Sequence, residues 1–525
     1  MRPLFLFILL FPLLRLEAQT TADIIIKNGR ILDGTGNSWF RADLAIKDGK
    51  IISIGKLQGL QALKTIDAGG KIVSPGFIDV HTHIEDDEFK NPTANNFIHD
   101  GVTTVVTGNC GASNVDIKKY LWRIDSLHPS INVATLIGHN DIRKAVMGRA
   151  NRKPTEEEML KMEELVDRAM QDGAVGISTG LLYIPGTYSE AGELIRLSKV
   201  VSRHNGIYTS HMRSEGDSIV SAIEEALRIG REANIPVQIS HFKISGQHNW
   251  GKSTVTLGMV QKAREEGIEV TIDQYPYTAS STSLSTLIPE EILADGNDSI
   301  RARLSRPEIR DHVVKALQKG LKKRKLKHFS YAVVANHNAD TSYNGKSIEQ
   351  INLIKGRKHK AREEAQTIID MMLAGGASMV FHGMGEEDIK RIMKYPFSMF
   401  ASDASIRIFN QGVPHPRGYG TNARVLAQYV RKEKLISLEE AVRRMTSLPA
   451  QKFGLKDRGL IKEGMAADLL VFDENQVQDL STFDKPHAYS KGMEVVIVNG
   501  KLIVENGVHL GTRSGVALFP ALYKF

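Results

Sequence analysis

Cysteine is almost absent from this chain of 525 residues, in which Cys110 is the only one. A single cysteine cannot form an internal disulfide, so a disulfide-stabilised fold is excluded. Long apolar runs are missing beyond the N-terminus, and no membrane span is expected after it. Nucleic-acid-binding motifs are missing too, although the formal net charge is +8. We therefore expect a globular enzyme-sized protein with no nucleic-acid partner.

The N-terminal stretch MRPLFLFILLFPLLRLEAQ combines a short basic start, an apolar run and a small residue, Ala18. This pattern predicts a cleaved secretory signal peptide over residues 1–18. An uncleaved anchor is the alternative, although Pro12 and Arg15 interrupt the apolar run. The protein is therefore expected to be exported, to the periplasm or outside the cell.

Two regions rich in β-branched residues and tight turns lie at opposite ends of the remaining chain. Residues 19–75 contain Asn-Gly, Asp-Gly and Gly-Thr-Gly, and residues 456–525 contain AADLLVFD and EVVIVNGKLIVENG. Such turns are typical of antiparallel hairpins. We expect one small β-sandwich domain built from both ends of the chain.

Between these ends, residues 76–455 alternate apolar runs with amphipathic helices such as EEEMLKMEELVDRAMQ, and SLEEAVRRMTSL begins with a capping-box pattern from Ser437 to Glu440. Strand and helix in alternation indicate parallel β/α units. Eight strands can be identified: GFIDV, TTVVTG, NVATLIG, AVGISTG, IYTS, PVQIS, EVTIDQY and FSMFAS. Eight units predict a closed (β/α)8 TIM-like barrel.

The last two strands are separated by far more chain than a β/α connection needs, which predicts an insertion at about 288–395. Two basic runs fall inside it, LKKRKLKH at 321–328 and KGRKHKAR at 355–362. A solvated helical face is the simplest interpretation of such runs, and binding of an anionic surface is the alternative.

Polar side chains follow most of the predicted strands, and the ends of parallel strands share one face of a barrel. His81 and His83 form an HxH pair whose side chains leave an extended chain on the same side. Three further strand ends supply His211, His241 and Asp403. Together they predict a metal site, in which a thiolate from Cys110 is a natural zinc ligand. A lone cysteine can also be a buried apolar residue or pair with another chain.

A set of motifs closely resembles the N-acyl-D-amino-acid deacylases, or D-aminoacylases, of the amidohydrolase superfamily. They are GFIDVHTHIEDD, VVTGNCGAS, STGLLYIPGTYS, YTSHMR, ISHFK, DQYPYTASS, FASDAS and PHPRGYGTNARVL. The resemblance runs from about residue 22 to 510. It implies an amidohydrolase barrel with the small β domain, and an insertion that can cover the pocket as a lid.

The resemblance also implies the metal ligands. His81 and His83 would serve one metal position and His211 and His241 the other, with Cys110 able to reach both. Members of this family often hold one tight zinc ion, which we expect at Cys110, His211 and His241, and a second position that is weak or empty.

The implied chemistry is hydrolysis of the amide of an N-acyl-D-amino acid, giving a carboxylate and a free D-amino acid. Zinc lowers the pKa of a bound water, so that a hydroxide can attack the carbonyl, and Asp403 acts as general base and then general acid. The resemblance assigns the substrate carboxylate to Lys243 and Arg417. Other substrate contacts expected nearby are Tyr183, either Tyr275 or Tyr277, and Ser281.

Two alternatives remain open. A dipeptidase or cyclic-amide hydrolase could use the same scaffold, and a non-catalytic amidohydrolase-like protein could use the basic patch for binding. His139 and His382 are interpreted as supporting or structural residues. The segment GHNDIRKAVMG and the spacing from Asp403 to PHPR depart from the family pattern, which leaves the substrate less defined than the reaction.

Overall fold

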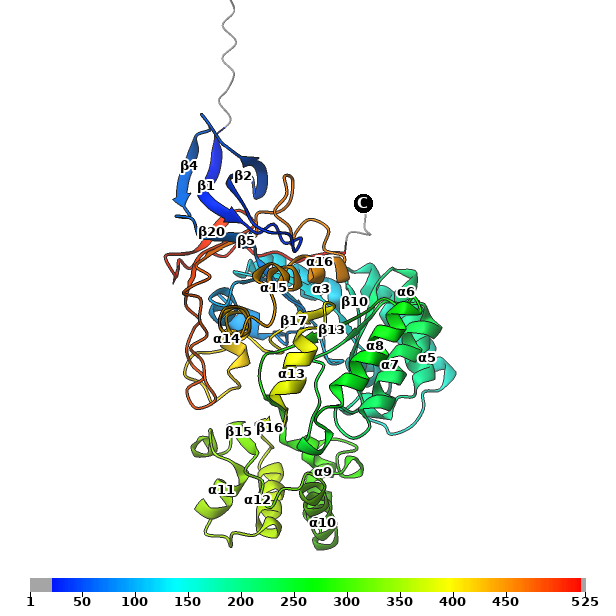
Figure 1. Cartoon of the computed structure of the whole chain (residues 1–525). Helices are drawn as coiled ribbons and strands as arrows, with labels where there is room; N and C mark the ends of the chain where they lie inside the picture. The colour runs from blue at the N-terminus through cyan, green and yellow to red at the C-terminus, as the bar shows by residue number, and fades with distance from the viewer. Residues whose placement is uncertain (1–20, 521–525) are drawn as a thin grey trace, which may run out of the picture.

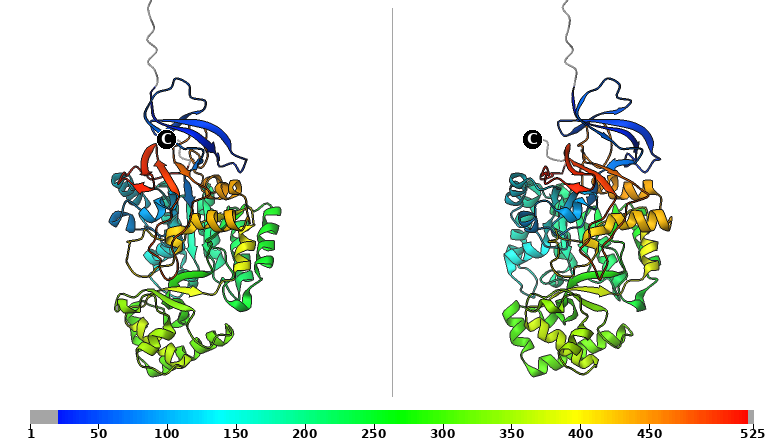
Figure 2. Two further views of the ribbon diagram at one scale, coloured as in Figure 1. Left: turned by 60° about the vertical axis from the view of Figure 1, so that its left-hand side comes forward. Right: turned by 90° about the vertical axis from the view of Figure 1, so that its left-hand side faces the viewer.

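A computed structural model describes residues 21–520, and the predicted signal peptide lies outside these residues. The described chain forms a central α/β barrel, a β domain at one end and an inserted subdomain at the other (Figure 1). Turning the molecule keeps the three parts in the same order along its length (Figure 2). No helix within residues 21–520 has the length and apolar character needed to cross a bilayer.

The barrel consists of parallel strands that pair in chain order, and all eight predicted strands are present. Thr82 bridges Ala404 in parallel, which brings the last strand next to the first and closes the barrel. Leu136 interrupts the third strand, which therefore consists of two segments. The strands are β6 (Phe77–Asp79), β7 (Val102–Thr107), β8 (Asn132–Thr135) with β9 (Ile137–Gly138), β10 (Gly176–Gly180), β11 (Ile207–His211), β12 (Val237–Ile239), β13 (Val270–Gln274) and β17 (Ser398–Phe400).

Helices cover the outside of the barrel, and their apolar stripes explain their positions. In α5 (Glu156–Gln171) a capping box joins Thr155 and Glu158, and Met162 and Val166 are buried against the barrel. The other covering helices are α3 (Ile117–Leu127), α4 (His139–Met147), α6 (Ala191–Arg203), α7 (Ile219–Ala233), α8 (Ser253–Glu265), α13 (Glu386–Met393), α14 (Arg417–Arg424), α15 (Leu438–Met445) and α16 (Ser447–Lys452).

The capping box predicted at Ser437 is only half formed. The Ser437 side chain accepts a hydrogen bond from the backbone N–H of Glu440 at 3.1 Å. The return bond is not made, because the Glu440 carboxylate pairs with Arg443 instead, at 2.7 Å. At the N-terminus of α15 the serine side chain therefore caps the helix, and the glutamate side chain does not take part in the cap.

The β domain is one mixed sheet of nine strands assembled from both ends of the described chain. β5 pairs antiparallel with β18, with Val73 opposite Val471. Near the other edge Lys50 bridges Ala466, so the sheet bends back over an apolar core of its own. The strands are β1 (Ala22–Ile31), β2 (Phe40–Lys47), β3 (Lys50–Gly55), β4 (Ala62–Asp67), β5 (Ile72–Pro75), β18 (Leu469–Phe472), β19 (Met493–Val498), β20 (Lys501–Glu505) and β21 (Val508–His509).

The inserted subdomain has its own three-stranded antiparallel sheet, in the order β14, β16, β15, and its own apolar core. It spans residues 279–382, whereas the sequence placed the insertion at about 288–395. The difference at its end arises because α13 packs on α8 and on the main core of the barrel. Its elements are β14 (Ala279–Ser283), α9 (Asn297–Leu304), α10 (Pro307–Lys323), β15 (Ala332–Asn336), α11 (Ile348–Ile354), α12 (Ala361–Leu373) and β16 (Ser378–His382).

Candidate functional site

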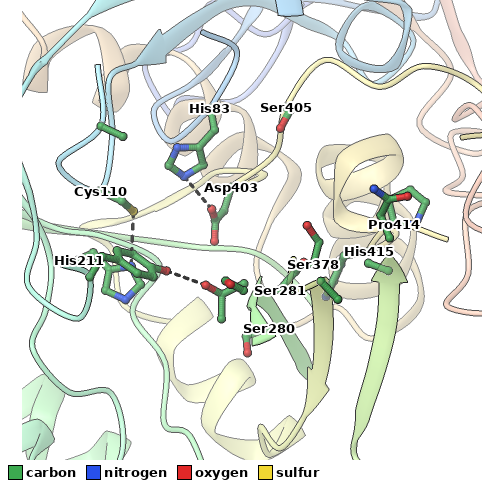
Figure 3. A pocket seen from close by; sticks show the side chains of 18 of the residues that line it. His83, Cys110, His211, Ser280, Ser281, Ser378, Asp403, Ser405, Pro414 and His415 are labelled. Carbon is green, nitrogen blue, oxygen red and sulfur yellow. Dashed lines mark hydrogen bonds and ion pairs between the residues drawn. The ribbon is translucent and has the colours of Figure 1, made fainter. Parts of the chain in front are cut away.

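A cavity of about 970 Å³ lies where the carboxyl ends of the barrel strands meet the inserted subdomain. Its floor carries the predicted site residues, which come from different strand ends and point toward one another (Figure 3). His81 lies beneath the floor and is fully buried. The other members of the predicted metal site line the cavity: His83, Cys110, His211, His241 and Asp403.

Cys110 stands at the centre of the imidazoles. Its Sγ lies 3.3 Å from His81 Nε2, 3.4 Å from His211 Nδ1 and 3.7 Å from His241 Nε2. The glycine that follows permits this placement, since a Cβ on Gly111 would lie 2.2 Å from Asn140 Oδ1. Close packing therefore requires a glycine directly after the cysteine.

The two halves of the predicted metal site meet at Asp403. Its Oδ1 lies 3.2 Å from His83 Nε2 and 3.6 Å from His81 Nε2. Its backbone N–H donates to the carbonyl of His81 at 2.9 Å, which fixes the end of β17 against the end of β6. Arg417 Nη1 forms an ion pair with Oδ2 at 2.8 Å.

Three of these residues adopt a left-handed backbone conformation, which is uncommon for residues other than glycine. The φ angles are 54° for Cys110, 34° for His241 and 51° for Asp403. Such strain is retained when surrounding structure holds it, and it concentrates at functional sites. Here it turns each side chain from its strand end into the cavity.

The imidazole donors differ in protonation. Against the effect of burial, neighbouring acidic groups raise the pKa of His81 and raise that of His83 to about 10, so these two must lose a proton to bind a metal. Burial, reinforced by neighbouring positive charge, holds the pKa of His211 and His241 well below the usual range, so both imidazoles are neutral. Burial raises the pKa of the Cys110 thiol, although the neighbouring His83 and Lys243 oppose this. A metal ion is what keeps a buried sulfur of this kind as a thiolate.

Asp403 is ionised. Burial alone would raise its pKa, but the charges of Arg417 and His81 hold the pKa well below the usual range. One donor atom from each of Cys110, His211 and His241 lies within 4.8 Å of the others, and the same holds for His81, His83 and Cys110. Sulfur and imidazole donors gathered in this way fit zinc.

Two acidic residues that the sequence did not reveal support the histidines. Asp273 Oδ1 accepts the backbone N–H of His241 at 2.7 Å and lies 3.4 Å from His81 Nδ1. Glu215 Oε1 lies 2.8 Å from His241 Nδ1 and also pairs with Lys243. The only signal in the sequence is their position, one near the end of EVTIDQY and one just after YTSHMR.

The predicted substrate contacts separate into two groups. Lys243, Arg417, Tyr183, Tyr275 and Ser281 line the cavity. Tyr277 lies outside the cavity lining and packs against His415, Phe483 and Arg424. Both hydroxyls are buried without a hydrogen-bond partner among the described residues, and Tyr275 is the one of the two that lines the cavity.

Both predicted carboxylate-binding cations already have acidic partners, Glu215 for Lys243 and Asp403 for Arg417. A further cation, Arg407, lines the same cavity. No hydrogen bond or ion pair joins its guanidinium to another residue within 21–520, and its Nε is buried. The pKa of Arg407 is lowered by burial and by the nearby charge of Arg417.

The two histidines interpreted as supporting residues lie away from these donors. His139 Nε2 donates a hydrogen bond to the carboxylate of Glu193 at 2.7 Å, and Arg143 pairs with the same carboxylate. His382, the last residue of β16, packs against Phe483.

Comparison with known proteins agrees with this geometry. Residues 64–504 match the model of the Amidohydrolase family. N-acyl-D-glutamate deacylase of Alcaligenes xylosoxydans xylosoxydans is 35% identical over 504 residues, which cover 92% of this chain and 93% of the relative.

Two solved structures are similar over the whole fold. N-acyl-D-glutamate deacylase of Bordetella bronchiseptica, solved with zinc and a phosphonate inhibitor that mimics the tetrahedral intermediate, gives a TM-score of 0.80 with 34% identity and covers 96% of this chain and 100% of its own. A D-aminoacylase described with a binuclear metal centre gives 0.80 with 33% identity, covering 95% and 100%.

Proposed function

Because this chain belongs to the amidohydrolase family, and within it to the N-acyl-D-amino-acid deacylases, we propose that it hydrolyses the amide of N-acyl-D-amino acids in a metal-dependent reaction. The observation that carries the proposal is the convergence of Cys110, His211 and His241 beside the ionised Asp403 at the mouth of the barrel. The products are a carboxylate and a free D-amino acid.

Cys110, His211 and His241 would hold the tight zinc ion, and His81 and His83 would contribute a second, weaker position. When bound there, zinc supplies Lewis-acid chemistry, since it lowers the pKa of water and polarises an amide carbonyl. The remaining work falls to the protein. Asp273 accepts the backbone N–H of His241 and faces Nδ1 of His81, and Glu215 faces Nδ1 of His241. These contacts orient the two imidazole rings.

Asp403 moves the proton. Its carboxylate takes a proton from the attacking water and passes it to the nitrogen of the departing amine, so one group serves as base and then as acid. The ion pair between Arg417 Nη1 and Asp403 Oδ2, at 2.8 Å, fixes the orientation of the carboxylate. The left-handed backbone at Asp403 directs it toward His83 and the cavity.

The substrate carboxylate enters a cavity wall of positive charge formed by Lys243 and Arg417, next to the hydroxyls of Tyr275 and Ser281. Both cations share their charge with acidic partners, so they act as positioned donors and not as free charges. Tyr183 closes this side, with its ring 4.7 Å from the ring of His211 and its hydroxyl 2.9 Å from Thr282 Oγ1.

Arg407 gives the cavity a preference for a second carboxylate, that of an acidic D-amino-acid side chain. A guanidinium that forms no ion pair within the described chain favours an anionic ligand, because binding replaces its lost hydration with a charged hydrogen bond. The relative that acts on N-acyl-D-glutamate supports this substrate class. Arg407→Met should raise KM for N-acetyl-D-glutamate far more than for N-acetyl-D-methionine, and an equal change for both would refute the role.

Export by the N-terminal signal remains part of the proposal. Its support is the sequence pattern of residues 1–18. N-terminal sequencing of the mature protein from an expressing bacterium tests it: a start at Gln19 is expected, and an intact Met1 would contradict cleavage.

The decisive experiment combines metal content with stereospecific hydrolysis. Wild-type protein and Cys110→Ala are analysed for bound zinc and assayed with N-acetyl-D-glutamate, N-acetyl-D-methionine and their L isomers. We expect wild type to hold zinc and to cleave only D isomers, and the variant to lose both properties. Cleavage of free-amine dipeptides or cyclic amides instead would assign the site to another amidohydrolase reaction, and absence of zinc from both proteins would refute the mechanism.

A further inference from the structure

A second cluster of metal-ligand side chains lies in the inserted subdomain, far along the chain from the cavity floor. It draws on four separate segments: the loop between α10 and β15, the first turn of α11, the loop between α11 and α12, and the first turn of α12 (Figure 1). One donor atom of each member lies within 4.8 Å of the others: His328, Glu349, His359 and Glu364.

The four donors form one connected group, because Glu349 faces both imidazole rings and Glu364 pairs with one of them. The rings of His328 and His359 stack with centroids 4.0 Å apart and an interplanar angle of 20°. Glu349 Oε1 faces both rings, 2.5 Å from His359 Nε2 and 3.8 Å from His328 Nδ1. Glu364 Oε1 closes the group, 2.6 Å from His328 Nδ1.

The spacing resembles that of the catalytic donors. Between Cys110, His211 and His241 the donor distances run from 2.7 to 3.7 Å. A tetrahedral zinc site with bonds of about 2.0 to 2.2 Å separates its donors by about 3.3 to 3.6 Å. In the second cluster the donor distances given above run from 2.5 to 3.8 Å, on either side of that separation.

The cluster is anchored on its protein side. Glu364 is fully buried, and its second oxygen accepts the backbone N–H of Phe329 at 2.8 Å. His359 remains half exposed, which gives an ion a path of entry. A buried, hydrogen-bonded carboxylate with an exposed imidazole opposite is a well-supported ligand set.

Charge explains why a cation suits this place. Both basic runs of the sequence reach the cluster, since His328 ends the first and His359 lies inside the second. The carboxylates of Glu349 and Glu364 supply the two negative charges that would balance a divalent ion in this basic part of the subdomain.

We propose that the inserted subdomain holds a structural zinc ion of its own, bound by four side chains: His328, Glu349, His359 and Glu364. Four protein ligands leave no open position for substrate, so the site is structural and not catalytic. Nitrogen and oxygen donors in this mixture select zinc over calcium or magnesium.

The ion would connect the metal-binding loops to the cavity wall. β15 begins four residues after His328, and its Ala335 and Asn336 line the cavity. At the far end of α12, Ala374 to Ser378 also line it. Zinc at this cluster therefore ties together the elements that present the subdomain to the substrate.

The test counts zinc in the full-length chain. Wild type, His359→Ala and the control His312→Ala are supplied with zinc, desalted and analysed for metal per chain. His312 is a matched control because it forms an exposed pair with one carboxylate, Glu291, at 3.0 Å in the same subdomain. His359→Ala should lose one zinc equivalent and His312→Ala none.

The catalytic zinc is removed from the count by repeating the measurement in a His211→Ala background. There the remaining zinc should disappear when His359→Ala is added and persist with His312→Ala. Equal zinc content in the His359→Ala variant and wild type would overturn the proposal. Should His359→Ala fold poorly by circular dichroism, Glu349→Gln keeps the shape of its side chain and should lose the same equivalent.

Discussion

Replacing Asp273 by asparagine should weaken metal binding without touching a ligand. The Asp273 carboxylate accepts the backbone N–H of His241 at 2.7 Å and the amide of Gln238 at 2.6 Å, and it faces His81 Nδ1 at 3.4 Å. Asparagine keeps the first bond, loses the negative charge that faces His81, and sets its own amide N–H against that of Gln238. His241 and His81 are then held less firmly in the orientation that metal binding requires.

The size of the effect follows from similar supporting carboxylates. Loss of such a partner typically costs about 10- to 100-fold in metal affinity, which corresponds to about 1.4 to 2.8 kcal/mol. A hydrogen bond to a charged group contributes about 1.5 to 3 kcal/mol to stability, so a decrease of this order in the free energy of unfolding should accompany the loss.

The assay is competition for zinc with a chelator of known affinity, followed by activity with and without excess zinc. Activity of Asp273→Asn should fall at limiting zinc and recover when zinc is added in excess. Asp100→Asn is the matched control, since the buried Asp100 accepts the backbone N–H groups of Asn422 and Ala423 and has no histidine partner. Zinc affinity within twofold of wild type in Asp273→Asn would refute the reasoning.

Three further results are expected. Burial and the nearby His509 lower the pKa of His99 to about 4, so the folded state resists protonation of this side chain. The free energy of unfolding should therefore fall by up to about 3 kcal/mol as pH drops from 6.5 to 4. In His99→Phe, which preserves the stack on Tyr489, denaturant titrations at the two pH values should show a smaller fall. Thr155→Ala removes the cap of α5 and should cost about 1 kcal/mol of unfolding free energy, with an unchanged value contradicting the capping role. If the basic runs attract anionic substrates, kcat/KM should fall steadily with added salt at constant kcat, whereas salt-independent kcat/KM would exclude this attraction.

Much of the fold and site could be predicted because parallel barrels place strand ends on one face. The eight strands were each marked by an apolar run, and the residues after them included every member of the metal cluster, from His81 to Asp403. Periodicity and strand order are local properties of a sequence. They are sufficient where one rule of topology brings the local pieces together.

What could not be predicted depends on paths of loops and on competition between partners. Glu215 reaches His241 only because of the turn that follows β11, and the pairing of Arg417 with Asp403 depends on where α14 begins. Glu440 had the spacing of a capping residue but pairs with Arg443. Contacts of this kind are decided by three-dimensional packing and leave no periodic trace.

The pairing of β5 with β18 has a consequence for how the chain is made. Roughly 400 residues lie between these two strands, and at synthesis rates of about 5 to 20 residues per second that length takes about 20 to 80 seconds. During that interval β5 forms an unpaired edge of the first five strands, because β18 has not yet been synthesised. An unpaired edge invites association with other chains, so the nascent protein depends on delayed folding or on a chaperone until its last strands emerge.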